Sequence, residues 1–117
     1  MKTVLEHLNR SVGVVGSAVM THDGILVTSA IADRHDQDAL TAIGSSLVQS
    51  TQRSLRNYDD SELLLMTIDG SRGRIVLVKA ASAFLLIITD STIALDATLL
   101  DIKSAVGKLQ KLITLDA

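Results

Sequence analysis

The sequence contains no cysteine, no proline and no tryptophan, and its only aromatic residues are Tyr58 and Phe84. Without cysteine, disulfide scaffolds, thiolate catalysis and every cysteine-based zinc or iron–sulfur site are excluded. Two isolated aromatic rings cannot form the base-stacking platform of single-stranded nucleic acid binders. Eleven basic and thirteen acidic residues give a formal charge of −2, so the basic face that a phosphate backbone requires is lacking. We therefore expect no nucleic acid partner.

Long hydrophobic runs are also missing. The longest apolar stretch, Ala83–Ile88, is far shorter than the roughly 18 residues of a membrane-spanning helix, so no membrane insertion is expected. Glu6 lies where a signal peptide would be apolar, which favours a cytoplasmic protein. The length of 117 residues predicts a single domain, residues 1–117. The mean hydropathy of +0.36 is high for a small monomer and indicates a sheet covered on both faces, or apolar surface covered by a partner.

The first half of the chain predicts a short helix, a hairpin and a long helix. The short amphipathic helix is Lys2–Arg10, and the hairpin joins Val14–Met20 to Ile25–Ser29 through an Asp-Gly turn. The long helix is expected to begin at an N-cap, Asp36, and to run to about Asn57. Its core-facing stripe repeats every three or four residues: Leu40, Ile43, Gly44, Leu47, Thr51, Leu55 and Tyr58.

Three apolar runs, Glu62–Asp69, Arg74–Lys79 and Phe84–Thr89, follow with short turns between them. Short turns force antiparallel pairing, whereas continuously apolar strands indicate a sheet covered on both faces. A last amphipathic helix is predicted from Leu95 to Ile113. The predicted class is α+β, in the order α-β-β-α-β-β-β-α. A five-stranded antiparallel sheet would then lie between helices, with the long helix on one face and the terminal helices on the other.

Candidate catalytic and metal-binding residues are few. A divalent metal is conceivable at two histidines and the acids near them: His22, His35, Asp23, Asp33, Asp36 and Asp38. These residues lack the helical spacing of a zinc motif, and turn or cap bonding accounts for them better. The serines lie outside G-x-S-x-G, and the glycines form no phosphate-binding motif. We therefore assign no catalytic residue, metal or cofactor, and expect no enzyme activity.

Two features favour association with another chain. Beside its core stripe, the long helix carries a small-residue stripe consisting of Ala39, Ala42, Ser46, Ser50 and Arg53. Small side chains let a second backbone approach closely, although such a stripe is also compatible with water. The next strand, Ser61–Asp69, is apolar in its middle and would expose an unpaired hydrogen-bonding edge if it were outermost in the sheet. Pairing with a symmetry mate would cover both features, so we expect a homodimer rather than a self-sufficient monomer.

The spacing of apolar and glycine positions is distinctive in four segments: Val12–Met20, His22–Ser29, Ala39–Ile43 and Phe84–Ile88. With these segments the chain resembles, over nearly its whole length, the Roadblock/dynein light chain family, particularly its bacterial and archaeal members. Two departures are local. Ala94-Leu95-Asp96 replaces the family's frequent Asn-Leu-Gly, and Ser11 and Val12 stand where a proline commonly precedes the glycine.

The resemblance implies a Roadblock/profilin-like fold and a non-catalytic, dimeric scaffold or regulator of a small Ras-like GTPase. It also implies that the second helices of two chains pack together and their third strands pair into a ten-stranded sheet. The dimer interface carried over to this chain comprises Ala39, Ala42, Ser46, Ser50, Arg53, Leu63, Leu65 and Thr67. No motif specifies the GTPase, the residues that contact it, the type of regulation, or whether the dimer partner is a different Roadblock chain.

Two other functions remain open from the sequence. A GAF- or PAS-like small-ligand sensor has a similar order of elements, but such sensors enclose a pocket with long loops. Here only Ile31–His35 is long enough to serve as a lid. A metal-dependent hydrolase that uses His22, His35 and the loop aspartates is the third alternative.

Overall fold

The computed structural model of the protein describes residues 1–31, 37–90 and 95–115. Its elements, in chain order, are α1 (Lys2–Leu8), β1 (Val14–Thr21), β2 (Leu26–Ile31), α2 (Gln37–Asp59), β3 (Leu65–Asp69), β4 (Gly73–Ala80), β5 (Ala83–Asp90) and α3 (Leu95–Leu115). The predicted order and the α+β class are therefore confirmed. The predicted N-cap, Asp36, lies outside the described residues.

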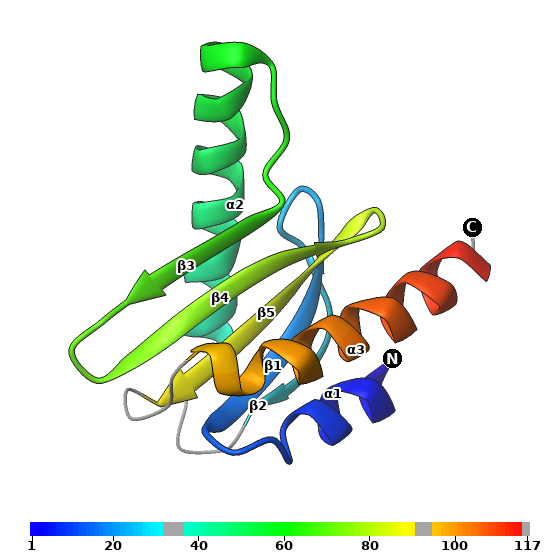
Figure 1. Ribbon diagram of the computed structural model, residues 1–117. Helices are drawn as coiled ribbons and strands as arrows, with labels where there is room; N and C mark the ends of the chain where they lie inside the picture. The colour runs from blue at the N-terminus through cyan, green and yellow to red at the C-terminus, as the bar shows by residue number, and fades with distance from the viewer. Residues whose placement is uncertain (32–36, 91–94, 116–117) are drawn as a thin grey trace.

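The five strands form one antiparallel sheet in the order β2-β1-β5-β4-β3. Figure 1 shows α2 on one face of this sheet and α1 and α3 on the other, as the sequence predicted. β5 lies at the centre, between β1 and β4, and its residues from Ala83 to Thr89 are all buried. A strand covered on both faces has no polar side, which explains why this run is continuously apolar.

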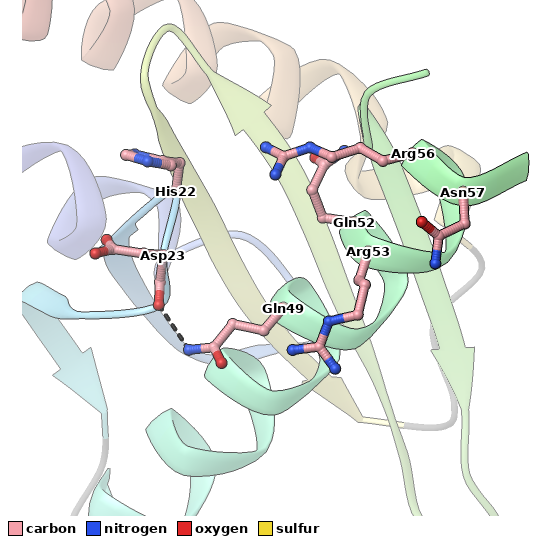
Figure 2. Close-up of a pocket in the computed structure, with 7 residues that line it drawn as sticks. All are labelled: His22, Asp23, Gln49, Gln52, Arg53, Arg56 and Asn57. Carbon is pink, nitrogen blue, oxygen red and sulfur yellow. Dashed lines mark hydrogen bonds between the residues drawn. The ribbon is translucent and has the colours of Figure 1, made fainter. Parts of the chain in front are cut away.

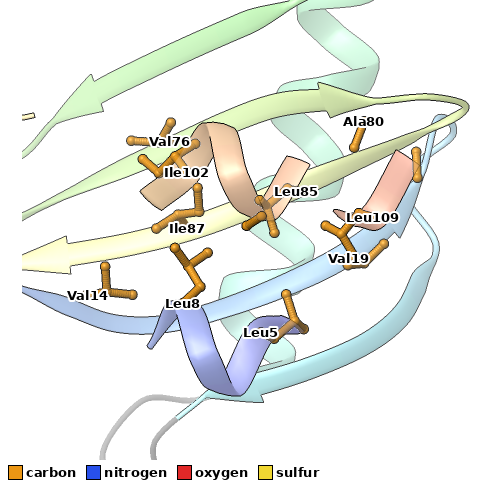
Figure 3. Close-up of a cluster of buried hydrophobic side chains, with 12 residues drawn as sticks. Leu5, Leu8, Val14, Val19, Val76, Ala80, Leu85, Ile87, Ile102 and Leu109 are labelled. Carbon is orange, nitrogen blue, oxygen red and sulfur yellow. The ribbon is translucent and has the colours of Figure 1, made fainter. Parts of the chain in front are cut away.

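The core on the α1/α3 side is continuous from helix to sheet (Figure 3). Leu5 and Leu8 of α1 and Ile102 and Leu109 of α3 are buried against the sheet. The sheet contributes aliphatic side chains of β1, β4 and β5: Val14, Val19, Val76, Ala80, Ala83, Leu85 and Ile87. Each fully buried aliphatic side chain of this kind contributes roughly 1.5–3 kcal/mol to folding.

The core on the α2 side is smaller. Met20, Leu77, Phe84 and Leu86 of the sheet pack there with Val48 of α2. A Cβ atom at Gly44 would lie 2.8 Å from the terminal methyl carbon of Met20. A glycine at this point of the helix therefore lets the two backbones approach closely.

The helical stripe predicted to face the core is wrong at two positions. Ile43 is 46% exposed and Tyr58 is 84% exposed, while Val48, which was not predicted, is fully buried. Tyr58 is exposed because the C-terminal end of α2 continues past the sheet edge formed by β3 (Figure 1). Ile43 lies beside Gly44 along the helix but about 100–140° from Gly44 and Val48 around its axis, so its side chain faces away from the sheet. At 1.5 Å per residue the 23 residues of α2 span about 34 Å, and only Gly44 and Val48 among them are buried.

The strand after α2 starts later than predicted, at Leu65 rather than at residue 61 or 62. The side chain of Gln52 binds the connecting segment instead: its Nε2 donates to the Ser61 carbonyl at 3.1 Å, and its Oε1 accepts from the Leu63 N–H at 3.1 Å. These two bonds fix the segment against α2, so β3 is a short strand of five residues.

Candidate protein interaction surface

β3 forms one edge of the sheet. Among the described residues, β4 is the only strand that pairs with it. Its side chains alternate, so that Leu65, Thr67 and Asp69 are exposed while Met66 and Ile68 are partly buried. An edge strand of this kind presents a row of unpaired backbone groups that a second strand can complete.

Successive side chains of β3 point to opposite faces of the sheet. Leu65 lies opposite Val78, whose side chain packs against the α1/α3-side core, whereas Met66 packs with the α2-side core. Leu65 also lines an apolar groove of about 250 Å³ between β3, β4 and α3. At 52% exposure, Leu65 is among the most exposed large apolar side chains of the sheet.

α2 presents a second exposed surface. All five residues of the small-residue stripe (Ala39, Ala42, Ser46, Ser50 and Arg53) are exposed. Ile43 and Ser50 are seven residues apart, which places them within about 20° of each other around the helix axis. The exposed Ile43 therefore borders the stripe and adds apolar area that the sequence reasoning had assigned to the core.

The eight predicted interface residues fall into three groups in the structure. The five stripe residues lie on the outer side of α2, and Leu65 and Thr67 lie on β3, facing away from α2. Leu63 precedes β3 and is only 4% exposed, within the α2-side core. The two groups do not contact each other, but the elements that carry them do, because the Thr51 hydroxyl of α2 donates to the Met66 sulfur of β3 at 3.5 Å. A partner that ran along the edge of β3 would reach both groups.

Sequence reasoning missed Ile43 and Tyr58 as surface residues. Their spacing along the helix fits a core stripe, but that spacing shows neither which side of the stripe rests on the sheet nor where the sheet ends beneath the helix. The length of the predicted helix, from Asp36 to about Asn57, was the available signal, because a helix of roughly 30 Å is longer than a five-stranded sheet is wide.

Of the histidine and aspartate residues considered for a metal site, the structure describes His22, Asp23 and Asp38, and all three are exposed. His22 and Asp23 lie in the turn between β1 and β2, and His35, Asp33 and Asp36 lie outside the described residues. Within residues 1–31, 37–90 and 95–115, no three histidine, aspartate or glutamate side chains lie close enough together to hold a metal ion. In the same ranges, no helix has the length and apolarity needed to span a bilayer.

Two acidic side chains on this part of the molecule have lowered pKa values. The Thr21 hydroxyl donates a hydrogen bond to Asp23, which is the main reason that the pKa of this exposed carboxyl lies below its ordinary value. Lys79 Nζ donates to Glu62 Oε2 at 2.6 Å and in the same way lowers the pKa of Glu62. Both carboxylates are therefore held in the charged form by a neighbouring donor.

A family model described as the Roadblock/LC7 domain matches residues 1–90. A protein of unassigned function from Methanocaldococcus jannaschii is 29% identical over 107 residues, which cover 92% of this chain and 91% of the relative. The structure of Myxococcus xanthus MglB superposes with a TM-score of 0.86 at 19% identity, over 96% of this chain and 86% of that one.

A Roadblock/LC7 domain from Streptomyces avermitilis superposes with a TM-score of 0.84 at 11% identity, over 97% of this chain and 98% of that one. At such low identities the likeness to both solved structures concerns the fold. The fold predicted from the resemblance is thereby confirmed.

Proposed function

The chain belongs to the Roadblock/LC7 family, and from this premise we propose that it forms a dimer that acts as a non-catalytic platform and regulator for a small Ras-like GTPase. The proposal combines the family assignment with the surface formed by α2 and β3. The family assignment also favours this function over the GAF- or PAS-like ligand sensor. The cytoplasmic location and the choice between identical and different partner chains stay predictions.

One observation carries the dimer proposal: α2 continues past β3, the sheet edge at which no further strand is described (Figure 1). If the β3 strands of two chains pair antiparallel about a two-fold axis, each α2 extends over the partner's half of the sheet. The two sheets then form a single ten-stranded sheet, and the two β3 edges satisfy each other's backbone hydrogen-bonding groups. The same arrangement brings the two α2 helices side by side on one face.

The residues proposed to contact the partner chain are those with exposed side chains on α2 and β3. The small-residue stripe allows the two helices to approach closely, and the bordering Ile43 supplies apolar area for the partner to cover. Tyr58, at the end of α2 that continues past β3, supplies more. Leu65 and Thr67 take part through β3. Leu63, which was predicted to be an interface residue, acts indirectly in this proposal, because its buried side chain holds the start of β3 against α2.

The GTPase part of the proposal rests on the family assignment. The paired α2 helices would give the dimer a broad face of mostly small and polar side chains, which suits reversible binding of a folded protein better than permanent association. Regulation without catalysis requires that the platform bind one nucleotide state of the GTPase more tightly than the other.

Two measurements test the proposal in sequence. Light scattering at micromolar concentration is expected to give twice the 12.4 kDa mass of one chain. The dimer, immobilised and incubated with native lysate, is then expected to retain a small GTPase in a nucleotide-dependent manner, with unequal capture in excess GDP and in a non-hydrolysable GTP analogue. A monomeric mass contradicts the dimer, and equal retention in both nucleotides contradicts the regulatory role.

A further inference from the structure

A second cleft lies between the β1–β2 turn and the C-terminal half of α2, and it shares only Arg53 with the proposed dimer interface (Figure 2). Its volume is about 350 Å³, and it is lined by His22, Asp23, Gln49, Gln52, Arg53, Arg56 and Asn57. We propose that this cationic cleft binds a small oxyanion of the phosphate class, such as phosphate or pyrophosphate. This goes beyond the proposed function, because neither the dimer nor its GTPase partner requires a small ligand.

Hydrogen bonds of two α2 side chains fix the walls of the cleft, which are the β1–β2 turn and α2 itself. On the hairpin side, Gln49 Nε2 donates to the Asp23 carbonyl at 2.8 Å. A Cβ atom at Gly24, whose φ is +88°, would lie 2.3 Å from Ser45 Oγ, so the turn rests directly on the helix. On the α2 wall, the Gln52 side chain is held in place by its bonds to the backbone at Ser61 and Leu63. Walls that are already held in place lose little freedom when a ligand binds.

The cleft has more positive than negative charge. Arg53 and Arg56 lie three residues apart, on one side of α2, and neither forms an ion pair within the described part of the chain. In Figure 2 the Arg56 guanidinium extends towards the side of the cleft where His22 lies. A planar guanidinium can donate two parallel hydrogen bonds to a phosphate oxygen pair, which makes arginine well suited to this class of anion.

Two acidic groups at or beside the cleft, Asp23 and Glu62, are already engaged. Among the described residues that line the cleft, Asp23 alone is acidic, and its carboxylate accepts a hydrogen bond from the Thr21 hydroxyl. Glu62 interacts electrostatically with Arg56, but its hydrogen-bond partner is Lys79 on β4. An arginine in the last turn of a helix is also favoured by the helix dipole. The helix dipole explains why an arginine is favourable at position 56. It does not explain why the hydrogen-bond donors His22, Arg53 and Asn57 line the same cleft.

The lining favours a small ligand over a protein segment. All seven lining side chains are polar or charged, whereas protein interfaces gain most of their affinity from buried aromatic and aliphatic anchors. The cleft volume also falls in the range of about 300–1,000 Å³ that is common for small-molecule sites.

Titration of the full-length protein with phosphate and pyrophosphate, followed by amide NMR at constant ionic strength, tests this proposal. We expect saturable shifts confined to His22, Asp23 and residues 49–57, with pyrophosphate binding more tightly because it presents more charge. Arg56→Gln is expected to weaken pyrophosphate binding about tenfold, the loss of one charged hydrogen-bonding pair. Arg56 is used because it is outside the predicted dimer interface, which includes Arg53. Light scattering of the same samples separates a lost ligand site from a lost dimer.

Arg10→Gln is the matched control, because Arg10 is exposed, lies just after α1 on the other side of the sheet, and changes the net charge equally. Its pyrophosphate affinity is expected to equal that of the unaltered protein. Equal weakening by Arg10→Gln and Arg56→Gln, or shifts spread over all basic residues, would show non-specific attraction and overturn the proposal. If a hexaglutamate peptide shifts the cleft residues and pyrophosphate does not, the cleft is a docking site for acidic peptides and the phosphate assignment is wrong.

Discussion

The two edge strands of the sheet differ in what covers them. β2 is packed against α1, where Asn9 Nδ2 donates to the Ala30 carbonyl at 2.7 Å and Asn9 Oδ1 accepts from the Ser17 hydroxyl at 2.7 Å. β3 has no comparable cover in the described part of the chain, and α2 continues past it. Both edges expose one large aliphatic side chain to a similar degree, Val27 at 50% and Leu65 at 52%. Apolar exposure therefore does not distinguish the edges, whereas the helix cover does.

The two long helices repeat this contrast. α3 buries Thr98, Ile102, Ala105 and Leu109, at spacings of four, three and four, and so lies on the sheet along one continuous face. α2 is longer but buries only Gly44 and Val48. A helix whose apolar side chains remain exposed beyond the sheet is most simply explained by a partner that covers them. The prediction of a dimer can therefore be tested on α2 and β3, with α3 and β2 as internal controls.

The largest effect is expected from Ser46→Arg, at the centre of the small-residue stripe. Two arginines would be placed between the paired helices, at a cost of about 2–4 kcal/mol, the cost of burying a charge without a partner. Light scattering across a dilution series is expected to report a monomer where the unaltered chain is a dimer. Ser104→Arg, the same substitution at an exposed position of α3, should leave the mass unchanged. A dimer that survives Ser46→Arg removes the α2 contact from the proposal.

The contact between β2 and the end of α1 can be weakened by replacing Asn9. Asn9→Ala removes the 2.7 Å acceptor of the Ser17 hydroxyl, which is fully buried and otherwise has only the Leu5 carbonyl at 3.4 Å. The free energy of unfolding is expected to fall by about 1–3 kcal/mol, as for other buried hydroxyls that lose their partner. Urea denaturation measures the change. The double variant Asn9→Ala/Ser17→Ala should recover part of it, and Asn57→Ala, at an exposed position, should have almost no effect.

The edges themselves can be compared with one substitution on each. Leu65→Lys places a charge at the β3 edge, where apolar contact and strand pairing are proposed, and should weaken the dimer by about 1–2 kcal/mol, roughly tenfold in Kd. Val27→Lys changes a side chain of similar exposure on β2 and should leave the dimer unchanged. Analytical ultracentrifugation gives both dissociation constants. A stronger effect of Val27→Lys would mean that β2, not β3, is the pairing edge.

The fold was predictable because local patterns agreed with one another. The Asp-Gly turn, the continuously apolar Phe84–Thr89 run and the period of the last helix each indicate an element and the faces that it buries. The sheet order was not specified by these patterns. The position of β3 at an edge entered the sequence argument only as a condition, and the structure meets it.

The candidate surface was predictable in part. Small residues at helical spacing identified the exposed side of α2, and all five of them are exposed. Ile43 and Tyr58 were wrongly assigned to the core, because their burial depends on which side of α2 rests on the sheet and on where the sheet ends. Leu63 stays a predicted interface residue, although its side chain is buried in the α2-side core. The cationic cleft was not foreseen, since His22 and Arg56 are far apart in the sequence and meet only through the packing of the hairpin on α2.

The smallest effect concerns the ion pair that joins Glu62, just before β3, to Lys79 of β4. Because Lys79 lowers the pKa of Glu62 below its ordinary value of 4.5 in the folded state, the pair stabilises the fold above that value. This stabilisation is lost as the pH falls through the lowered pKa of the folded state. The difference in melting temperature between the unaltered chain and Lys79→Gln should therefore be small at pH 7, and smaller still in acid or in high salt. A difference that grows as the pH falls would mean that Lys79 stabilises β4 through its aliphatic stem rather than through Glu62.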